Sequence, residues 1–135
     1  MSFKTIEVEL NAHGDMKDLT PEIQKFVKDS EKKNGAVLVF VVGSTGAVTT
    51  IEYEPGLKKD FPRIMDKIAP YSDYYEHHET WHDDNGSSHV KASIVGPSLL
   101  IPFMNKKLML GTWQQVVVIN FDTRPRRRKI ILQIL

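Results

Sequence analysis

The second half of the chain is divided into short extended runs, and this division restricts the fold more than any other feature of the sequence. Runs rich in β-branched and aliphatic residues follow one another after residue 88, interrupted by Gly96-Pro97, Pro102 and Gly111. Such runs are typical of antiparallel strands, because parallel strands need long crossover connections. The expected strands here are residues 89–95, 98–102, 107–110, 112–121 and 129–135.

Three more strands are expected in the first half of the chain. Residues 6–10 alternate between apolar and polar side chains, which predicts a strand with one wet face. Residues 36–42 form a β-branched run without alternation, which indicates a strand buried on both faces. A Gly-Ser-Thr-Gly turn at residues 43–46 then leads into an expected strand over residues 47–52.

Two helices are expected between these strands. Thr20 and Pro21 form a start signal, and the Asn34-Gly35 pair is a stop signal. Ile23, Phe26 and Val27 would form the apolar face of this first helix. The second helix is expected to begin at Asp60 as its cap, with Pro62 in its first turn. Its apolar side chains are Phe61, Ile64, Met65 and Ile68.

Eight strands and two helices predict an α+β fold made of β-rich, sandwich-like antiparallel sheets with the helices on one side. The chain has 135 residues, of which 41% are hydrophobic, so we expect one domain over residues 1–135. No apolar run is long enough to span a membrane. The first residues alternate in polarity and do not form the hydrophobic region of a signal peptide. We therefore expect a cytoplasmic protein without a membrane partner.

Composition excludes several kinds of site. The chain has no cysteine, which excludes disulfides, thiolate zinc sites and a cysteine nucleophile, so any metal must be bound by nitrogen and oxygen. Five basic residues lie within residues 124–129, and without them thirteen basic residues stand against seventeen acidic ones. The overall charge of +1 is far below the basic balance of nucleic-acid-binding proteins, so no nucleic-acid partner is expected.

Histidines gather in one polar segment, where four of the five lie within residues 77–89. His89 is expected to be the first residue of a strand, with its side chain on the polar face of that strand. His77 could fold back beside it across the loop at residues 83–86. Two imidazoles, with one carboxylate or water, would satisfy zinc or a similar divalent ion. The alternative is a hydrophilic surface loop whose histidines only titrate and form hydrogen bonds.

Two other motifs also have a functional and a structural interpretation. Trp113 and Gln114 follow Gly111, and the tryptophan is either a core residue or a platform for a ligand ring. The run at residues 124–129 could bind phosphate through guanidinium groups, or it could be a charged edge strand that discourages aggregation.

Taken together, several motifs resemble the small YjbQ-type proteins. They are the Tyr-x-His at residues 75–77, the polar Asn-Gly loop, the His-x-Lys at 89–91, and the Gly-Thr-Trp-Gln block at 111–114. The threonine-rich turn at residues 43–52 ends in a glutamate, as in that family. The resemblance covers residues 6–134, nearly the whole chain.

The resemblance implies a β-rich α+β fold, a homotrimer, and thiamine-phosphate synthase activity of a weak, secondary kind. That reaction joins a pyrimidine-methyl diphosphate to a thiazole phosphate, so a small phosphorylated molecule is the expected partner. The alternatives are a metal-dependent hydrolase that uses the histidines around an activated water, and a non-catalytic module that binds phosphorylated ligands.

Site residues follow from the same resemblance. His77, His89 and Glu52 match the family's expected catalytic positions, and His77 and His89 would also bind a divalent metal, zinc or magnesium. His78 and His82 fall where the family varies. The expected substrate-binding residues are Ser44, Thr45, Trp113, Gln114, Arg126, Arg127 and Arg128.

One position departs from the family pattern. Many members have a histidine immediately before the threonine turn, where this chain has Gly43. If that histidine binds metal, this chain lacks one ligand, and water, a carboxylate or a neighbouring subunit would have to replace it.

Overall fold

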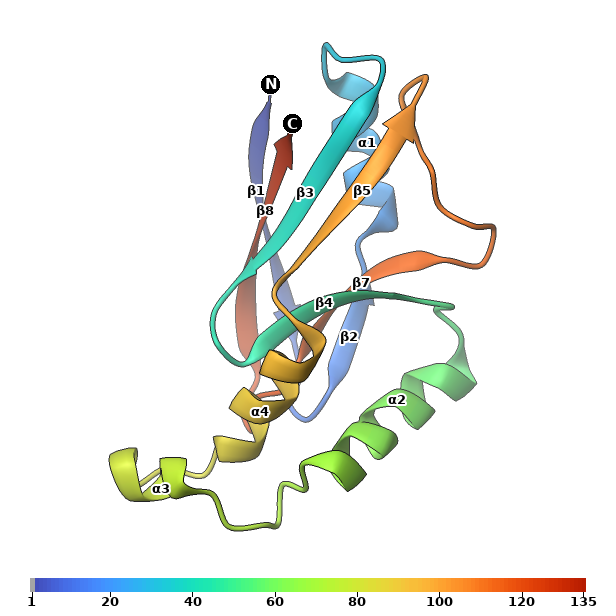
Figure 1. Cartoon of the computed structure of the whole chain (residues 1–135). Helices are drawn as coiled ribbons and strands as arrows, with labels where there is room; N and C mark the ends of the chain where they lie inside the picture. The colour runs from blue at the N-terminus through green and yellow to red at the C-terminus, as the bar shows by residue number, and fades with distance from the viewer. Residues whose placement is uncertain (1) are drawn as a thin grey trace.

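The computed structural model describes residues 2–135 as two antiparallel sheets with four helices (Figure 1). The larger sheet has the strand order β1-β8-β3-β5-β6 and the smaller has the order β2-β7-β4. The strands are β1 (Phe3–Leu10), β2 (Asp15–Asp18), β3 (Gly35–Val42), β4 (Gly46–Ile51), β5 (Ser98–Met104), β6 (Lys107–Leu108), β7 (Gln115–Asn120) and β8 (Arg126–Ile134). The helices are α1 (Thr20–Asp29), α2 (Pro55–Ile68), α3 (Glu76–Trp81) and α4 (Gly86–Val95).

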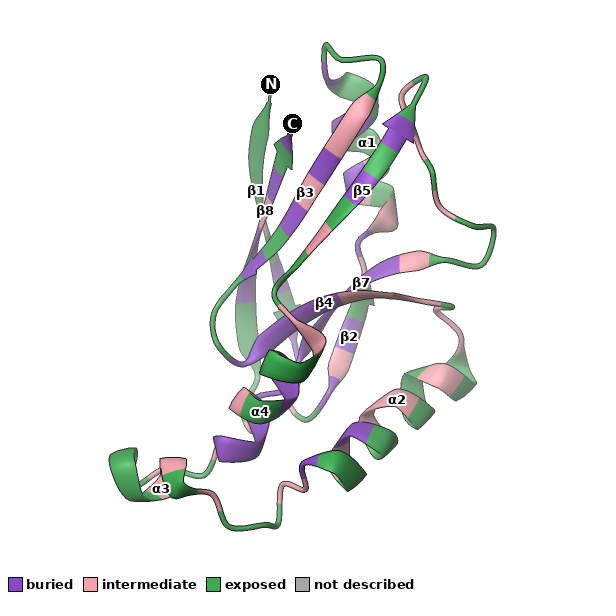
Figure 2. Cartoon of the chain, in the orientation of Figure 1, coloured by how far each residue is buried: buried purple, intermediate pink, exposed green. Residues whose placement is uncertain are grey.

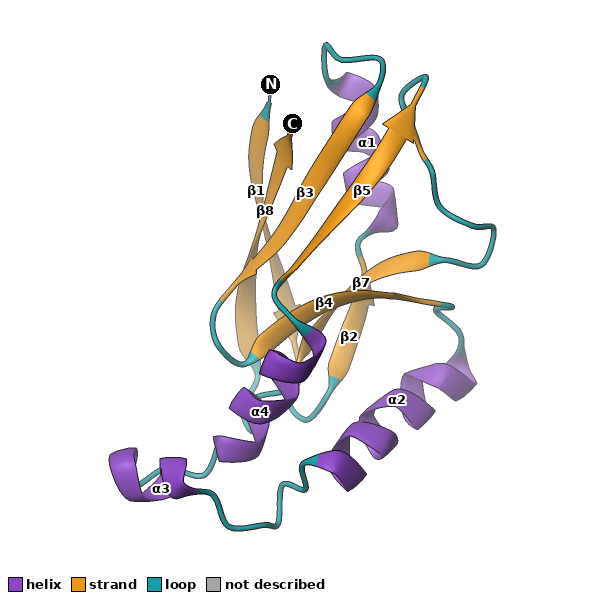
Figure 3. Ribbon diagram, in the orientation of Figure 1, coloured by secondary structure: helices purple, strands orange, loops and turns teal. Residues whose placement is uncertain are grey.

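The predicted α+β class with antiparallel sheets is confirmed, and the three-stranded sheet lies between two apolar cores. Its residues Val48, Val116 and Val118 join the larger sheet and α1 in one core. Its residues Val117 and Ile119 face the other way, into a second core with α2 and α4. Helices α1 and α2 therefore lie on opposite faces of the three-stranded sheet but on the same side of the larger sheet (Figure 3). The prediction of helices on one side holds for the larger sheet and was wrong for the smaller one.

Burial on both faces belongs to β7 rather than to β3. Val116 to Ile119 are all 0% exposed, because β7 is the middle strand between the two cores. In β3 only alternate residues are buried, whereas Phe40 and Val42 are 37% and 41% exposed. The prediction that residues 36–42 are buried on both faces was therefore wrong.

The outer face of the larger sheet has no covering element among the described residues (Figure 2). Leu38 lies opposite Leu100 in the sheet register, and Phe40 lies opposite Ile131. Leu100 is 60% exposed. We call this surface, formed by Leu38, Phe40, Val42, Leu100 and Ile131, the outer apolar face.

Residues 89–95 form most of α4, so the prediction of a strand there was wrong. The alternation of apolar residues is misleading because Val90 and Ile94 are exposed, while Lys91 and Ala92 are buried. Helix signals stand at both ends of the segment. Asn85 is the N-terminal cap and Gly96, with φ of +101°, ends the helix.

The first two helices also differ from their predicted limits. Helix α1 ends at Asp29, five residues before the expected stop. Helix α2 begins at Pro55, and the side chain of Glu54 caps it by accepting hydrogen bonds from Gly56 N (2.8 Å) and Leu57 N (2.5 Å). Asp60 is therefore not its cap, and Pro62 lies in the helix interior. Strand β2 and helix α3 were not predicted.

No helix within residues 2–135 is long and apolar enough to cross a membrane.

Candidate functional site

Five segments converge at one end of the three-stranded sheet. Helix α3 contributes His77 and α4 contributes His89, while the turn at residues 43–46 joins β3 to β4. The chain leaving β7 contributes Asp122, and the start of β8 contributes Arg126 and Arg128. We call this group the histidine site.

The rings of His77 and His89 lie side by side, with centroids 4.5 Å apart and planes inclined by 55°. The predicted proximity of these rings is confirmed, although a helix rather than a strand carries His89. His77 Nε2 lies 3.2 Å from Asp83 Oδ1 and 3.0 Å from the amide group of Asn85. A carboxylate next to one ring nitrogen fixes the tautomer and the orientation of an imidazole.

The environment of His89 favours its neutral form. Burial lowers the pKa of His89, and the neighbouring His77 lowers it further, against smaller opposing effects of Asp122, Asp83 and the Ser44 backbone. A neutral imidazole can accept a proton, which is a requirement for a base. The contact with the Ser44 backbone also places His89 next to the turn at residues 43–46.

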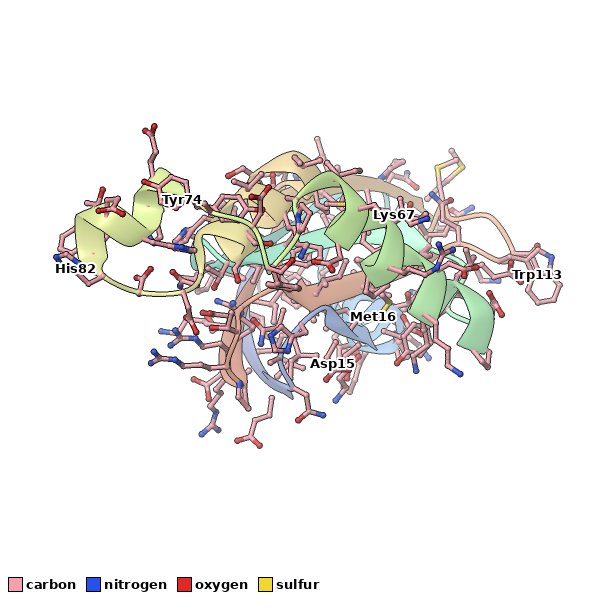
Figure 4. The ribbon with its side chains drawn as sticks, turned by 90° about the horizontal axis from the view of Figure 1, so that it is seen from below. Asp15, Met16, Lys67, Tyr74, His82 and Trp113 are labelled. Atoms are coloured by element: carbon pink, nitrogen blue, oxygen red, sulfur yellow. The ribbon has the colours of Figure 1, made fainter. Side chains whose placement is uncertain are left out.

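The two other histidines of the segment have different positions. His78 Nε2 accepts a hydrogen bond from Gly86 N (3.1 Å), so His78 helps to hold the start of α4. His82 ends α3 in the left-handed conformation with φ of +54° and is exposed. It points away from the body of the protein (Figure 4).

Arg128 lies beneath the turn, and two glycines leave room for it. A Cβ atom on Gly43 would lie 2.7 Å from Arg128 Nη1, and one on Gly46 would lie 3.0 Å from Nε. Arg128 Nη2 donates to Thr45 Oγ1 and Asn120 Oδ1, both at 2.6 Å. Arg128 is only 6% exposed, and Nε has no hydrogen-bond partner within residues 2–135. A fixed positive charge therefore occupies the space into which a side chain at position 43 would extend.

Asp122 connects the turn to Arg126. Its carboxylate accepts hydrogen bonds from Thr45 Oγ1 (3.0 Å), Thr123 N (2.7 Å) and Arg126 Nε (2.8 Å). Burial tends to raise the pKa of Asp122, but the hydrogen bonds from Arg126, Thr123 and Thr45 outweigh burial and hold it below its ordinary value. Asp122 is thus a buried anion that orders the cationic groups around it.

Arg126 and Arg127 lie on opposite faces of β8. The side chain of Arg126 is 45% exposed beside the buried Asp122. It also lines a hollow of about 560 Å³ together with Glu9, Leu10, Asn11, Pro125 and Arg127. Arg127 Nε instead pairs with Glu7 Oε2 (2.8 Å) on β1. The structure therefore places Ser44, Thr45, Arg126 and Arg128 at the histidine site, but aims Arg127 away from it.

Glu52, Trp113 and Gln114 lie at the other end of the three-stranded sheet. Ser44 and Thr45 precede β4 whereas Glu52 follows it, and a strand advances about 3.3 Å per residue, so the two ends are roughly 20 Å apart. Gln114 Nε2 donates to Thr50 Oγ1 (3.2 Å) at that far end. Trp113 is 71% exposed, and Figure 4 shows it opposite the end that carries Tyr74 and His82. Within one chain, these three predicted site residues do not meet the histidines.

The donor set for a metal is incomplete. Residues 2–135 contain no group of three or more histidine, aspartate or glutamate side chains suitably placed to bind an ion. His77 and His89 supply two donors, and the guanidinium of Arg128 occupies the space of a third ligand at position 43. A resident divalent ion would therefore need water, substrate or another chain to complete its coordination.

Two residues of the site, Asp122 and Asn120, were not predicted from the sequence. Asn120 Oδ1 accepts from Arg128 Nη2, and Asn120 Nδ2 donates to Asn11 O and Arg124 O, both at 2.9 Å. Polar residues at the end of an apolar strand could have indicated them, because Asn120 and Asp122 flank Phe121 after the run at residues 116–119.

Comparison with known proteins relates the whole chain to one family. Residues 4–135 match the family described as UPF0047 protein YjbQ-like. A UPF0047 protein of Archaeoglobus fulgidus is 36% identical over 87% of this chain and 89% of its own. The UPF0047 protein YugU of Bacillus subtilis is 30% identical and covers 98% of both chains.

Solved structures agree with this assignment. A YbjQ-like protein of unknown function from Sulfolobus solfataricus superposes with a TM-score of 0.91 at 30% identity, over 98% of this chain and 94% of that one. A YjbQ/UPF0047 protein from Clostridium acetobutylicum gives 0.89 at 32% identity, over 98% of this chain and 99% of that one. The chain therefore belongs to the YjbQ-like UPF0047 family.

Proposed function

We propose that this protein binds a small phosphorylated molecule at the histidine site and acts as a transferase of the thiamine-phosphate synthase type. The observation that carries the proposal is the close pair of His77 and His89 beside a turn with a fixed guanidinium beneath it. Imidazoles can transfer protons near neutral pH, and guanidinium groups bind phosphate oxygens. The two groups together suit a reaction whose leaving group is a polyanion.

In that reaction the bond between the pyrimidine methylene and the diphosphate oxygen breaks, and its electron pair leaves with the diphosphate. The thiazole nitrogen forms the new bond to the methylene carbon. Arg126 and Arg128 would stabilise the charge that develops on the diphosphate. Arg128 is suited to this role because Thr45 and Asn120 already fix its position. His77, whose Nε2 lies 3.2 Å from the carboxylate of Asp83, would provide a proton to the departing oxygen.

We further propose a homotrimer in which a neighbouring copy supplies the residues that one chain places too far away. Glu52, Trp113 and Gln114 lie at the opposite end of the three-stranded sheet from His77 and His89. The outer apolar face offers a surface for association, since Phe40, Val42 and Leu100 are exposed side by side with other apolar residues. In such an assembly, the indole of Trp113 could stack on a heterocycle bound at another subunit's histidine site.

A divalent ion, zinc or magnesium, bound by His77 and His89 remains a prediction of the family resemblance. Metal analysis of the purified protein tests it. The same measurement tests the metal-dependent hydrolase, because a protein that purifies without metal and keeps its activity in chelator cannot use a metal-activated water.

The test of the proposed function is formation of thiamine phosphate from the two phosphorylated substrates. We expect His77→Asn and His89→Asn each to lower kcat/KM by about 10²-fold or more. The control is His82→Asn, which keeps an exposed residue in the left-handed conformation that asparagine tolerates, and should leave the rate unchanged.

Three results would count against the transferase. No product from the natural chain, or equal rates in all three variants, contradicts catalysis at these histidines. Binding of both substrates without product identifies a phospho-ligand binding module instead.

A further inference from the structure

Lys91 is one of the two most deeply buried charged residues that the structure describes, since it and Asp122 each have 1% of their surface exposed. Its ammonium donates to Asp66 Oδ1 (2.9 Å) and to Ser87 Oγ (3.0 Å). It also lies 3.1 Å from the centroid of the Tyr71 ring, which is a cation–π contact. Burying a charge costs free energy unless partners such as these surround it. The three partners therefore stabilise the ammonium of Lys91 inside the protein and fix its position.

The partners of Lys91 lie at the two ends of one excursion of the chain. Asp66 is near the end of α2 and Tyr71 follows it, whereas Ser87 is in the first turn of α4. Two more hydrogen bonds close the same junction, from Ser87 Oγ to Ala69 O (2.5 Å) and from Tyr71 N to Asp66 Oδ1 (2.8 Å). Lys91 therefore fastens the base of the segment between residues 66 and 87.

This segment carries His77, while the helix that holds the fastening carries His89. Helix α3 has no buried residue and extends away from both sheets (Figure 1). Its position depends on the base of the excursion and on contacts with the start of α4, such as that of Gly86 N with His78 Nε2. His89 and Lys91 are two residues apart, so they project from different sides of α4.

We propose that Lys91 is a positioning residue whose buried ammonium, held by Asp66, Ser87 and Tyr71, keeps the segment carrying His77 against the helix carrying His89. The proposal rests on the proposed function only in treating these two histidines as the working groups. Removing the ammonium loosens residues 70–86 and separates the two rings, whereas the sheets stay folded. A residue that served only global stability would weaken every part of the protein alike.

The test uses Lys91→Met, which keeps the stem and removes the charge, with Lys67→Met as the matched control. Lys67 is an exposed lysine on α2, next to Asp66 (Figure 4). The readouts are the nuclear Overhauser effect between the His77 and His89 rings and the hydrogen exchange of individual amides. Neither needs a substrate, so the result is independent of whether the transferase activity exists.

In Lys91→Met we expect the ring-to-ring effect to disappear and the amides of residues 70–86 to exchange faster by at least about tenfold. The amides of β3, β7 and β8 should keep their protection, and Lys67→Met should resemble the natural protein. The proposal is overturned if Lys91→Met keeps both the ring-to-ring effect and the protection of residues 70–86. It is also overturned if protection falls equally in the sheets.

A second variant separates charge from shape and covers the case in which Lys91→Met fails to fold. The chain has no cysteine, so Lys91→Cys carries its only thiol. Alkylation of the unfolded variant with 2-bromoethylamine, followed by refolding, restores an ammonium on a side chain of nearly the length of lysine. We expect the alkylated protein to regain the ring-to-ring effect and the protection of residues 70–86. Recovery with iodoacetamide, which adds a neutral group, would contradict a role for the charge.

Discussion

At the scale of single residues, the turn at positions 43–46 is shaped by Arg128. Gly43 has φ of +122°, a conformation that favours glycine, and a side chain there would meet the guanidinium. Gly43, where the family resemblance implies a histidine, is therefore coupled to the position of this arginine. A change at Gly43 should disturb Arg128 as well as the backbone.

Gly43→Ala tests this coupling. We expect the free energy of unfolding to fall by more than the roughly 1–3 kcal/mol of backbone strain alone, because the methyl group also displaces Arg128. Gly96→Ala is the control, since Gly96 has φ of +101° with no atom within 4 Å of an added Cβ. Chemical denaturation measures both. Equal losses would contradict a close contact between Gly43 and Arg128.

The buried carboxylate of Asp122 should make the stability of the protein depend on pH in the acid range. Its pKa in the folded protein lies below the ordinary value of 3.8, so the folded state binds this proton more weakly than the unfolded state does. The stabilisation is therefore fully present above pH 3.8 and is lost as the pH falls through the folded pKa. We expect Asp122→Asn to be less stable than the natural chain at pH 6, with the difference shrinking toward pH 3. A difference that stays constant with pH would contradict the assignment.

At the scale of elements, the sequence predicts strands well where one face is apolar and fails where polar residues are buried. Residues 6–10 form part of β1 as expected, and Val8 and Leu10 are its buried residues. Helix α4 reverses this relation, because Lys91 faces inward and Ile94 faces outward. The partners that make a buried lysine stable, Asp66 and Tyr71, are distant in sequence, so local periodicity does not reveal them.

The same limit applies to the candidate site. The proximity of His77 and His89 follows from a polar loop between them, which the sequence displays. Trp113 and Gln114 are separated from these histidines because the two groups lie at opposite ends of the paired strands β4 and β7. That separation is set by the pairing of the strands in the sheet, which local sequence does not reveal. Asp122 was missed because its importance comes from three donors, of which Thr45 is distant in sequence.

The residue that caps the start of α2 differs between the sequence prediction and the structure, and substitutions at the two positions can distinguish them. Glu54→Ala should reduce the free energy of unfolding by about 1 kcal/mol, because two backbone N–H groups lose their acceptor. Asp60→Ala, at the cap position expected from the sequence, should change stability by less than about 0.5 kcal/mol. Thermal and denaturant unfolding of the two variants decide the matter, and a larger loss for Asp60→Ala would contradict the observed start of the helix.

At the scale of the whole molecule, one chain presents an apolar surface and a divided set of family-matched residues. The larger sheet has its inner face in the core, while Phe40, Val42 and Leu100 remain exposed on the outer face. Exposed apolar patches on soluble proteins commonly mark association surfaces. The proposed homotrimer would both cover this surface and bring Trp113 toward a histidine site.

Leu100→Glu tests the assembly. A carboxylate at the centre of a buried interface is strongly unfavourable, so we expect dissociation to a folded monomer in sedimentation experiments. Ile68→Glu is the control on α2, where Ile68 is 59% exposed and lies away from the outer apolar face. If the natural chain sediments as a monomer, the homotrimer is contradicted. If Leu100→Glu still sediments as a trimer, the outer apolar face is not part of the trimer interface.

The most direct test of the histidine site is a titration of the natural protein with inorganic pyrophosphate, followed by nuclear magnetic resonance. We predict that the backbone amides of Ser44 and Thr45 and the rings of His77 and His89 shift together along one binding curve, while His82 does not respond. Pyrophosphate that leaves all four of these groups unchanged, or that shifts another part of the chain alone, would contradict a phosphate site at this end of the sheet.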